Sequence, residues 1–128
     1  MSLDYLLIKP LRPCKSLIDV EENKSVGAAG YRKLADRVFP SARWDSPTHG
    51  FQMTELDSIE LTVSGAALHL NWRGKGNVVA VMSHIAAAAA PSGFALVDVQ
   101  CSDFFLPEEA KSAGYLEWYN NILAGYSG

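Results

Sequence analysis

Cysteine is scarce in this chain, and neither cysteine has neighbours that predict disulfide or metal chemistry. Cys14 and Cys101 stand alone, with no Cys-x-x-Cys spacing. Isolated cysteines of this kind are typical of reduced thiols inside the cell. The first residues also lack the basic segment and long apolar core of a secretory leader. We therefore expect a cytoplasmic protein.

Long hydrophobic runs are absent as well. The longest, Val78–Ala90, has 13 residues and includes Ser83 and His84. A membrane-spanning helix needs about 20 apolar residues. The sequence therefore predicts no membrane association.

An excess of positive charge is also missing, which argues against a nucleic-acid partner. The chain has 11 Lys and Arg against 14 Asp and Glu, a formal net charge of −3. The charge is uneven, because residues 1–43 hold eight basic and five acidic residues, whereas residues 44–128 hold three basic and nine acidic. An acidic body favours a basic partner, although a solvated acidic surface is the commoner explanation.

Recognisable catalytic and metal-binding motifs are lacking. The three histidines, His49, His69 and His84, are scattered and do not have the spacing of metal ligands on a helix. There is no serine-centred hydrolase motif, and neither cysteine has a sequence cue for activation. We expect a non-enzymatic protein with no metal and no cofactor.

The chain does contain enough apolar material for one domain. It has 128 residues, of which 48% are hydrophobic, and a domain of this size buries roughly two-thirds of the surface of its unfolded chain. No linker divides it, so a single domain over residues 1–128 is predicted. The apolar run Leu3–Lys9 predicts a central strand that ends at Pro10, and residues 10–24 read as a long loop.

The next segment predicts a helix. Ser25 is a plausible N-cap, and apolar residues then recur at the spacing of one buried helical stripe: Tyr31, Leu34, Ala35, Val38 and Phe39. Pro40 stops the helix. Residues 40–50 then read as a loop, and residues 51–54 as a short edge strand.

A hairpin is the clearest local signal. Apolar and polar residues alternate over 58–63 and again over 66–73. A two-residue turn at Ser64-Gly65 would place Leu61 opposite Leu68 and Glu60 opposite His69, although a longer loop in the same register remains open because Ser-Gly is not the best turn dipeptide.

The remaining elements complete an α+β pattern. Asn77 is the expected N-cap of a second helix that ends at Pro91-Ser92-Gly93. A strand over 94–100 and a terminal helix that begins at Pro107 follow. This order fits an antiparallel sheet with helices on one face, as in a ferredoxin-like β-α-β-β-α-β core, with a C-terminal helix added.

The loop between the hairpin and the second helix is one candidate site. Its glycines, at positions 74 and 76, would let backbone N–H groups face an anion, and two basic side chains would supply charge: Arg73, Gly74, Lys75, Gly76 and Asn77. Neither the dinucleotide fingerprint nor the phosphate-loop motif is complete. A glycine turn that needs a positive φ is the simpler explanation.

A second candidate site lies in the acidic body. Trp44 and Arg43 are residue types enriched at binding hot spots, although Trp44 could also fold back onto the core as a lid. A partner surface would combine these two residues with acidic groups and a histidine from the following strands: Asp45, Glu55, Asp57, Glu60 and His69. The aromatic terminal helix reads first as core covering and second as a dimer or partner face.

From residue 39 to residue 105 the chain resembles a group of small, mostly uncharacterised bacterial proteins. The pattern runs from Phe39-Pro40 through Trp44, Pro47, Gly50 and Ile59-Glu60 to Arg73-Gly74, Gly76 and Ala95-Leu96-Val97-Asp98. Similar proteins look like immunity or accessory proteins carried beside toxins, secretion systems or mobile gene cassettes. The resemblance implies an immunity-type or accessory protein. Because residues 44–128 hold three basic and nine acidic residues and the loop around Trp44 is aromatic, we expect an inhibitor that masks a basic toxin, with Trp44 as its hydrophobic anchor.

Two functions from different classes remain open. The first is this non-enzymatic protein binder, with either a protein partner or a second copy of the chain. The alternative is a small-molecule or anion binder, which could be dimeric, with an apolar pocket beside Arg73–Asn77. An enzyme that uses Glu60 and His69 as an acid–base pair is a distant third, because a structural contact explains that pair better.

Overall fold

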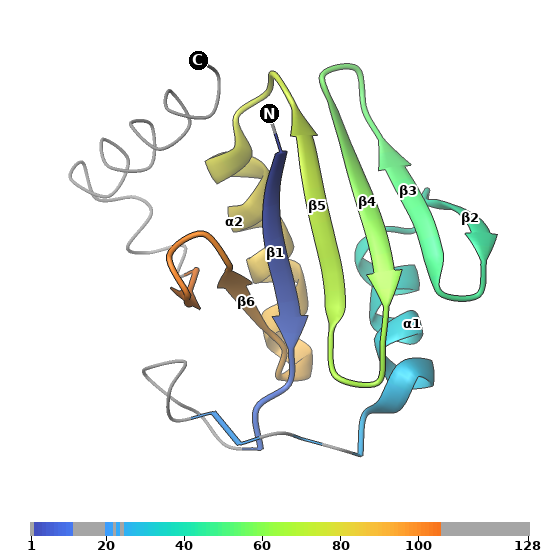
Figure 1. Ribbon diagram of the computed structural model, residues 1–128, viewed down its shortest axis with the longest axis vertical. Helices are drawn as coiled ribbons and strands as arrows, with labels where there is room; N and C mark the ends of the chain where they lie inside the picture. Colours follow the sequence, from blue (N-terminus) through green and yellow to red (C-terminus); the bar gives the residue numbers. More distant parts are fainter. Residues whose placement is uncertain (1, 12–19, 22, 24, 106–128) are drawn as a thin grey trace.

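The computed structural model describes residues 2–11, 20–21, 23 and 25–105 (Figure 1). The predicted terminal helix, Cys14 and most of the loop over 10–24 lie outside these residues. The described elements are β1 (Ser2–Ile8), α1 (Gly27–Val38), β2 (Arg43–Ser46), β3 (His49–Met53), β4 (Asp57–Val63), β5 (Leu68–Gly74), α2 (Val78–Ala89), a short 3-10 helix (Ala90–Ser92), β6 (Ala95–Asp98) and β7 (Asp103–Phe104).

One antiparallel sheet organises the described chain. Its strand order is β2-β3-β4-β5-β1-β6-β7, and α1 and α2 lie together behind it in Figure 1. The predicted α+β class is therefore confirmed. The sheet is wider than the four-stranded core that we expected, because β2, β3 and β7 extend it, so its strand order differs from that of a four-stranded ferredoxin-like sheet.

The predicted central strand is confirmed in β1. It pairs with β5 on one side and with β6 on the other, both antiparallel. Leu3, Tyr5 and Leu7 are fully buried on the helix-covered face, while the residues between them are partly exposed. Alternate residues of a strand face opposite sides of the sheet, so this apolar strand anchors the core at its centre.

Helix α1 begins at Gly27, whereas the expected N-cap was Ser25. Its N-cap is Val26, which makes no side-chain capping bond, so the expected role of Ser25 was wrong. The Ser25 backbone N–H instead donates to the Asn23 side chain at 3.1 Å. The predicted buried stripe of this helix is confirmed, because Val38 packs against the core and the other four residues are buried: Tyr31, Leu34, Ala35 and Phe39.

The β4–β5 hairpin has a longer turn than the favoured prediction. Leu61 lies opposite Leu70, and Val63 lies opposite Leu68, so the predicted register was wrong by two residues. The Ser64 hydroxyl accepts the N–H groups of Ala66 and Ala67 at 3.2 and 3.1 Å and so stabilises a four-residue loop. A shift of two residues keeps every side chain on its predicted face.

Helix α2 forms as expected. The Asn77 side chain accepts the N–H of Ala80 at 3.1 Å, and Gly93 ends the segment with a left-handed φ of 83°. Its core residues include Val78, Met82 and Ile85, which are buried against the sheet. Neither helix in the described part of the chain combines the length and apolarity needed to cross a bilayer.

Candidate functional site

The candidate site is built on a strand pair where the sequence predicted a loop. β2 and β3 form a tight hairpin around Pro47-Thr48, and the register shifts between Trp44 and Ser46. β3 in turn pairs with β4, with Phe51 opposite Glu60. The prediction of an unstructured 40–50 segment was therefore wrong, and β3 is not the edge strand, because β2 lies outside it.

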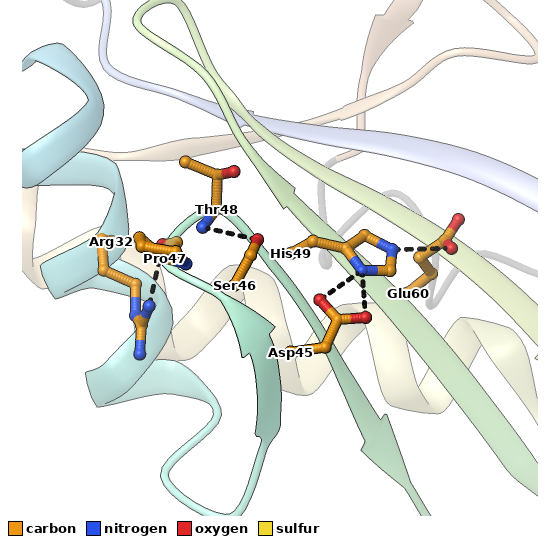
Figure 2. Close-up of polar contacts among 7 residues, drawn as sticks. All are labelled: Arg32, Asp45, Ser46, Pro47, Thr48, His49 and Glu60. Atoms are coloured by element: carbon orange, nitrogen blue, oxygen red, sulfur yellow. Dashed lines mark hydrogen bonds and ion pairs between the residues drawn. The ribbon is translucent and has the colours of Figure 1, made fainter.

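This hairpin assembles a histidine between two carboxylates, one from each neighbouring strand (Figure 2). The His49 Nδ1 lies 2.8 Å from both carboxylate oxygens of Asp45. The His49 Nε2 lies 3.0 Å from Glu60 Oε2. The three side chains are 33%, 60% and 42% exposed for His49, Asp45 and Glu60, so the cluster is open to solvent.

The two carboxylates favour the protonated form of the imidazole. The hydrogen bond to Glu60 and then the hydrogen bond to Asp45 raise the pKa of His49 above its ordinary value of 6.5, against a smaller opposing effect of burial. In the imidazolium form both ring nitrogens donate, one to each acid. The protonated cluster keeps one net negative charge.

This geometry engages both ring nitrogens of His49. With both nitrogens engaged by carboxylates, the ring has no free nitrogen with which to accept a proton from a substrate. Asp45 and Glu60 lie on opposite edges of the ring, so the three groups do not converge on one point (Figure 2). Among the described residues, no group of three or more His, Cys, Asp and Glu side chains is arranged to hold a metal ion.

Trp44 packs inward from β2 in the manner of a lid. It is partly buried against the core, and the Arg32 guanidinium carbon lies 3.6 Å from its ring centroid. Arg32 also donates to the Pro47 carbonyl at 2.8 Å. A Cβ atom at Gly50 would lie 2.8 Å from the indole ring, so glycine there allows the close approach of β3 to Trp44. This placement matches the lid alternative for Trp44.

Other apolar side chains are exposed along β3 and in the loop that follows it. Phe51, Met53 and Leu56 are 36%, 63% and 62% exposed, and the Phe51 ring meets the His49 ring edge-on at 4.9 Å. His49, Phe51 and Met53 are alternate residues of β3 and therefore share a face of the sheet. We call the following set the acidic–apolar edge: Asp45, His49, Phe51, Met53, Glu55, Leu56 and Glu60.

Sequence reasoning found the acids of this edge but not its other members. Asp45, Glu55 and Glu60 were predicted, whereas His49 was set aside as a metal ligand. Phe51 and Met53 were assigned only to a short strand, and Leu56 was assigned no role. The alternation of Phe51 and Met53 with Gly50 and Gln52 was the available signal, because it places the large apolar residues on one face. The partners of His49 depend on strand register, which no local pattern defines.

Two other predicted site residues, His69 and Arg43, are not members of the cluster. His69 is exposed and lies opposite Thr62, not Glu60, so the expected Glu60–His69 pair was wrong. The two-residue change in register moved Asn71 opposite Glu60 instead. Arg43 is exposed on β2 and pairs with Phe51 in the strand register.

The glycine loop at Arg73–Asn77 holds a carboxylate of the protein itself. Asp57 Oδ1 accepts the Gly76 N–H at 2.9 Å, and the Lys75 N–H donates to the Leu56 carbonyl at 3.1 Å. Neither Gly74 nor Gly76 has a positive φ. Their small size matters instead, because a Cβ atom at Gly74 would lie 2.5 Å from the Leu56 carbonyl oxygen. The backbone donors expected to face an anion are thus engaged by Asp57 and Leu56.

Cys101 is not activated for chemistry. Burial and the nearby Asp98 carboxylate raise the pKa of its thiol to about 11. Only a thiolate is a strong nucleophile, so the raised pKa keeps this thiol almost entirely protonated near neutral pH.

Comparison with known proteins adds no relative, since no family model, curated protein or solved structure matches the chain.

Proposed function

We propose that this chain is a cytoplasmic, non-enzymatic protein-binding module, of the kind found in immunity-type inhibitors, and that it binds a basic protein through the acidic–apolar edge. The observation that carries the proposal is the clustering of exposed apolar residues beside acidic groups. Of the large hydrophobic side chains that are exposed in the described residues, three fall within 51–56, namely Phe51, Met53 and Leu56.

Charge and apolar area have separate roles in this surface. The carboxylates of Asp45, Glu55 and Glu60 would steer a basic partner and select its orientation. Exposed apolar side chains supply most of the binding free energy at protein interfaces once water is excluded from them. A basic toxin is the partner that fits this combination, and a second copy of this chain fits less well because two acidic edges repel each other.

The alternative of an anion binder at Arg73–Asn77 has less support. Its Gly76 N–H already donates to Asp57, and the Arg73 side chain donates to Asn71 Oδ1 at 3.2 Å and not toward an empty site. An anion would have to displace Asp57 from the loop.

We also infer that the four strands β4, β5, β1 and β6 form a ferredoxin-like unit. Their neighbour order and fully antiparallel pairing support this assignment. On this proposal, the β2–β3 hairpin is an insertion between α1 and β4, and the acidic–apolar edge lies largely on that insertion. A binding surface on an inserted element leaves the core free of functional constraint.

The experiment pairs the purified chain with the protein encoded by the neighbouring gene. Binding is measured by titration calorimetry, and protection is measured as growth of cells that express both proteins. We expect a complex, and we expect Met53→Ser and Leu56→Ser each to weaken binding about tenfold. Added salt should weaken it further, because the carboxylates act through solvent.

The matched control is Leu11→Ser, which removes an equally exposed leucine far from the edge in sequence; Leu11 is 57% exposed. It should leave affinity and protection unchanged. The absence of any complex, or an equal loss of affinity in Leu11→Ser, would contradict the proposal.

A further inference from the structure

A cavity of about 470 Å³ opens between the end of α1, the middle of α2 and strands β3 and β4. Its walls are mostly apolar and include Val38, Phe39, Ile59, Val81 and Ile85, with Gln52 among the few polar residues. Cavities of this size are typical of small-molecule sites.

Strand β3 contributes one residue to the lining of the cavity. Its residues on the helix-covered face are Gly50 and Gln52, which pair with Leu61 and Ile59 of β4. Gln52 lines the cavity, whereas the Trp44 indole occupies the space over Gly50. Pro40, which also lines the cavity, follows the end of α1 closely and prevents that helix from extending over the gap.

The lining chemistry limits what the cavity can accept. It contains no Asp, Glu, Lys or Arg, and its one titratable side chain is His84, an exposed residue of α2. A charged group inside would lose its hydration without gaining a partner of opposite charge. The buried part of a ligand must therefore be uncharged.

Gln52 supplies one specific polar feature. Its Oε1 atom is buried and accepts no hydrogen bond, and its Nε2 makes a long contact of 3.4 Å with the Met53 carbonyl. A buried acceptor without a donor is costly. Because the only bond of this amide is weak, the side chain can turn its oxygen toward a donor in the cavity at little cost.

We propose that this cavity binds an uncharged, largely apolar small molecule that carries one N–H or O–H donor, with Gln52 as the acceptor. The site is separate from the acidic–apolar edge. Gln52 lies on the helix-covered face of β3, whereas His49, Phe51 and Met53 lie on the opposite face.

The test uses N-phenyl-1-naphthylamine, an uncharged aromatic probe with a single N–H, and the full chain. Its fluorescence rises in an apolar site, and we expect a saturable increase with one site per chain. Ala80→Phe places a ring in the cavity from an exposed position of α2 and should weaken binding at least tenfold. Ala88→Phe, at an exposed position of the same helix outside the lining, should leave binding unchanged.

A second variant tests the role of Gln52 without depending on Ala80→Phe. Gln52→Leu should weaken binding of the probe about threefold to tenfold, the usual effect of one lost hydrogen bond. It should not weaken binding of the N-methylated probe, which has no donor. Circular dichroism checks that each variant is folded.

Three results would overturn the proposal. One is the absence of saturable binding. Another is equal affinity in wild type, Ala80→Phe and Gln52→Leu. The third is loss of binding in Phe51→Ser but not in Ala80→Phe, since the probe would then sit on the acidic–apolar edge.

Discussion

At the residue scale, His49 connects three strands through two hydrogen bonds. Its ring nitrogens lie 2.8 Å from the Asp45 carboxylate on β2 and 3.0 Å from Glu60 on β4. An imidazolium between two carboxylates makes charge-assisted hydrogen bonds, which are stronger than neutral ones. The open solvent around the cluster screens these charges, so they define the local geometry more than they stabilise the whole fold.

The first prediction concerns the protonation of His49. The raised pKa of His49 in the folded chain means that the cluster stabilises the fold fully at pH values below the ordinary pKa of about 6.5. This contribution is lost as the pH rises through the raised pKa. Glu60→Gln should lower the pKa of His49, as measured from the pH dependence of its ring signals by NMR. Asp36→Asn, which removes a carboxylate that contacts Arg32 on α1, is the control and should not change it.

At the element scale, the loop from β5 to α2 is organised around Asp57 at the start of β4. Gly74 pairs with Asp57 in the strand register, and the Gly76 N–H donates to the Asp57 carboxylate. The two glycines permit this approach through their size, because neither has a positive φ. The start of α2 is therefore held to the start of β4 by a side chain far from it in sequence.

Alanine substitutions at the two glycines of this loop should lower the free energy of unfolding by different amounts. The new methyl group meets backbone atoms at position 74 but only the Asp57 side chain at position 76. In Gly74→Ala the new Cβ would meet the Leu56 carbonyl oxygen at 2.5 Å and the Asp57 Cα at 2.8 Å. We expect a loss of about 1–3 kcal/mol in the free energy of unfolding, measured by denaturant titration. Gly76→Ala should cost less, because its closest contact is the rotatable Asp57 carboxylate.

Gly65→Ala is the control, because nothing lies within 4 Å of a Cβ atom at that position and its φ is not positive. It should change stability by no more than about 0.5 kcal/mol. Equal losses in all three variants would contradict the crowding explanation, because the reduced flexibility of the unfolded chain in a Gly→Ala variant stabilises the fold and cannot cause a loss.

Local patterns in the sequence predicted the elements better than their connections. The apolar stripe of α1, the Asn77 cap and the alternation in β4 and β5 were all recognisable, because each depends on residues within one element. β2 was missed because Arg43–Ser46 has a single apolar residue and Pro47 suggested a loop. The hairpin register was wrong because Ser64 stabilises a four-residue loop through its own hydroxyl, which the turn dipeptide does not reveal.

The candidate site was predicted in part for the same reason. The acidic residues Asp45 and Glu60 were identified by composition, but the histidine between them was not. The contacts of Asp45 and Glu60 with His49 require β3 to lie between β2 and β4. This strand order is a property of the whole sheet and cannot be read from any single segment. Trp44 was assigned two roles, and the lid is favoured by contacts with the core, with Gly50 of β3 and with Arg32 of α1.

At the scale of the whole molecule, a buried carboxylate links stability to pH. Asp98 has no exposed surface, and its Oδ2 atom has no hydrogen-bond partner. Oδ1 accepts from the backbone N–H and the side chain of Gln100 at 3.0 and 2.7 Å. Burial nevertheless dominates and raises the pKa of Asp98 above its ordinary value of 3.8.

This shift makes a prediction for the global stability of the chain. Asp98 contributes most to the free energy of unfolding below pH 3.8, where its carboxyl group is protonated in both the folded and the unfolded chain. This contribution is lost as the pH rises through the raised pKa of the folded chain, because the unfolded chain releases its proton at a lower pH. Asp98→Asn removes the charge and should raise the free energy of unfolding at pH 7 but not near pH 3. Asp103→Asn, at an exposed position, should change neither value. Denaturant titrations at the two pH values provide the measurement, and a loss of stability at pH 7 in Asp98→Asn would contradict it.

The central place of β1 has a consequence for how the chain is made. Of the described strands β1 is synthesised first, yet its partners are residues 68–73 and 95–98. At the usual rate of synthesis, β1 waits roughly 5–20 s before the last of these partners has been added. During that interval Leu3, Tyr5 and Leu7, which the finished protein buries completely, have no sheet to join. The nascent chain therefore exposes an apolar segment until the strands that pair with it have been translated.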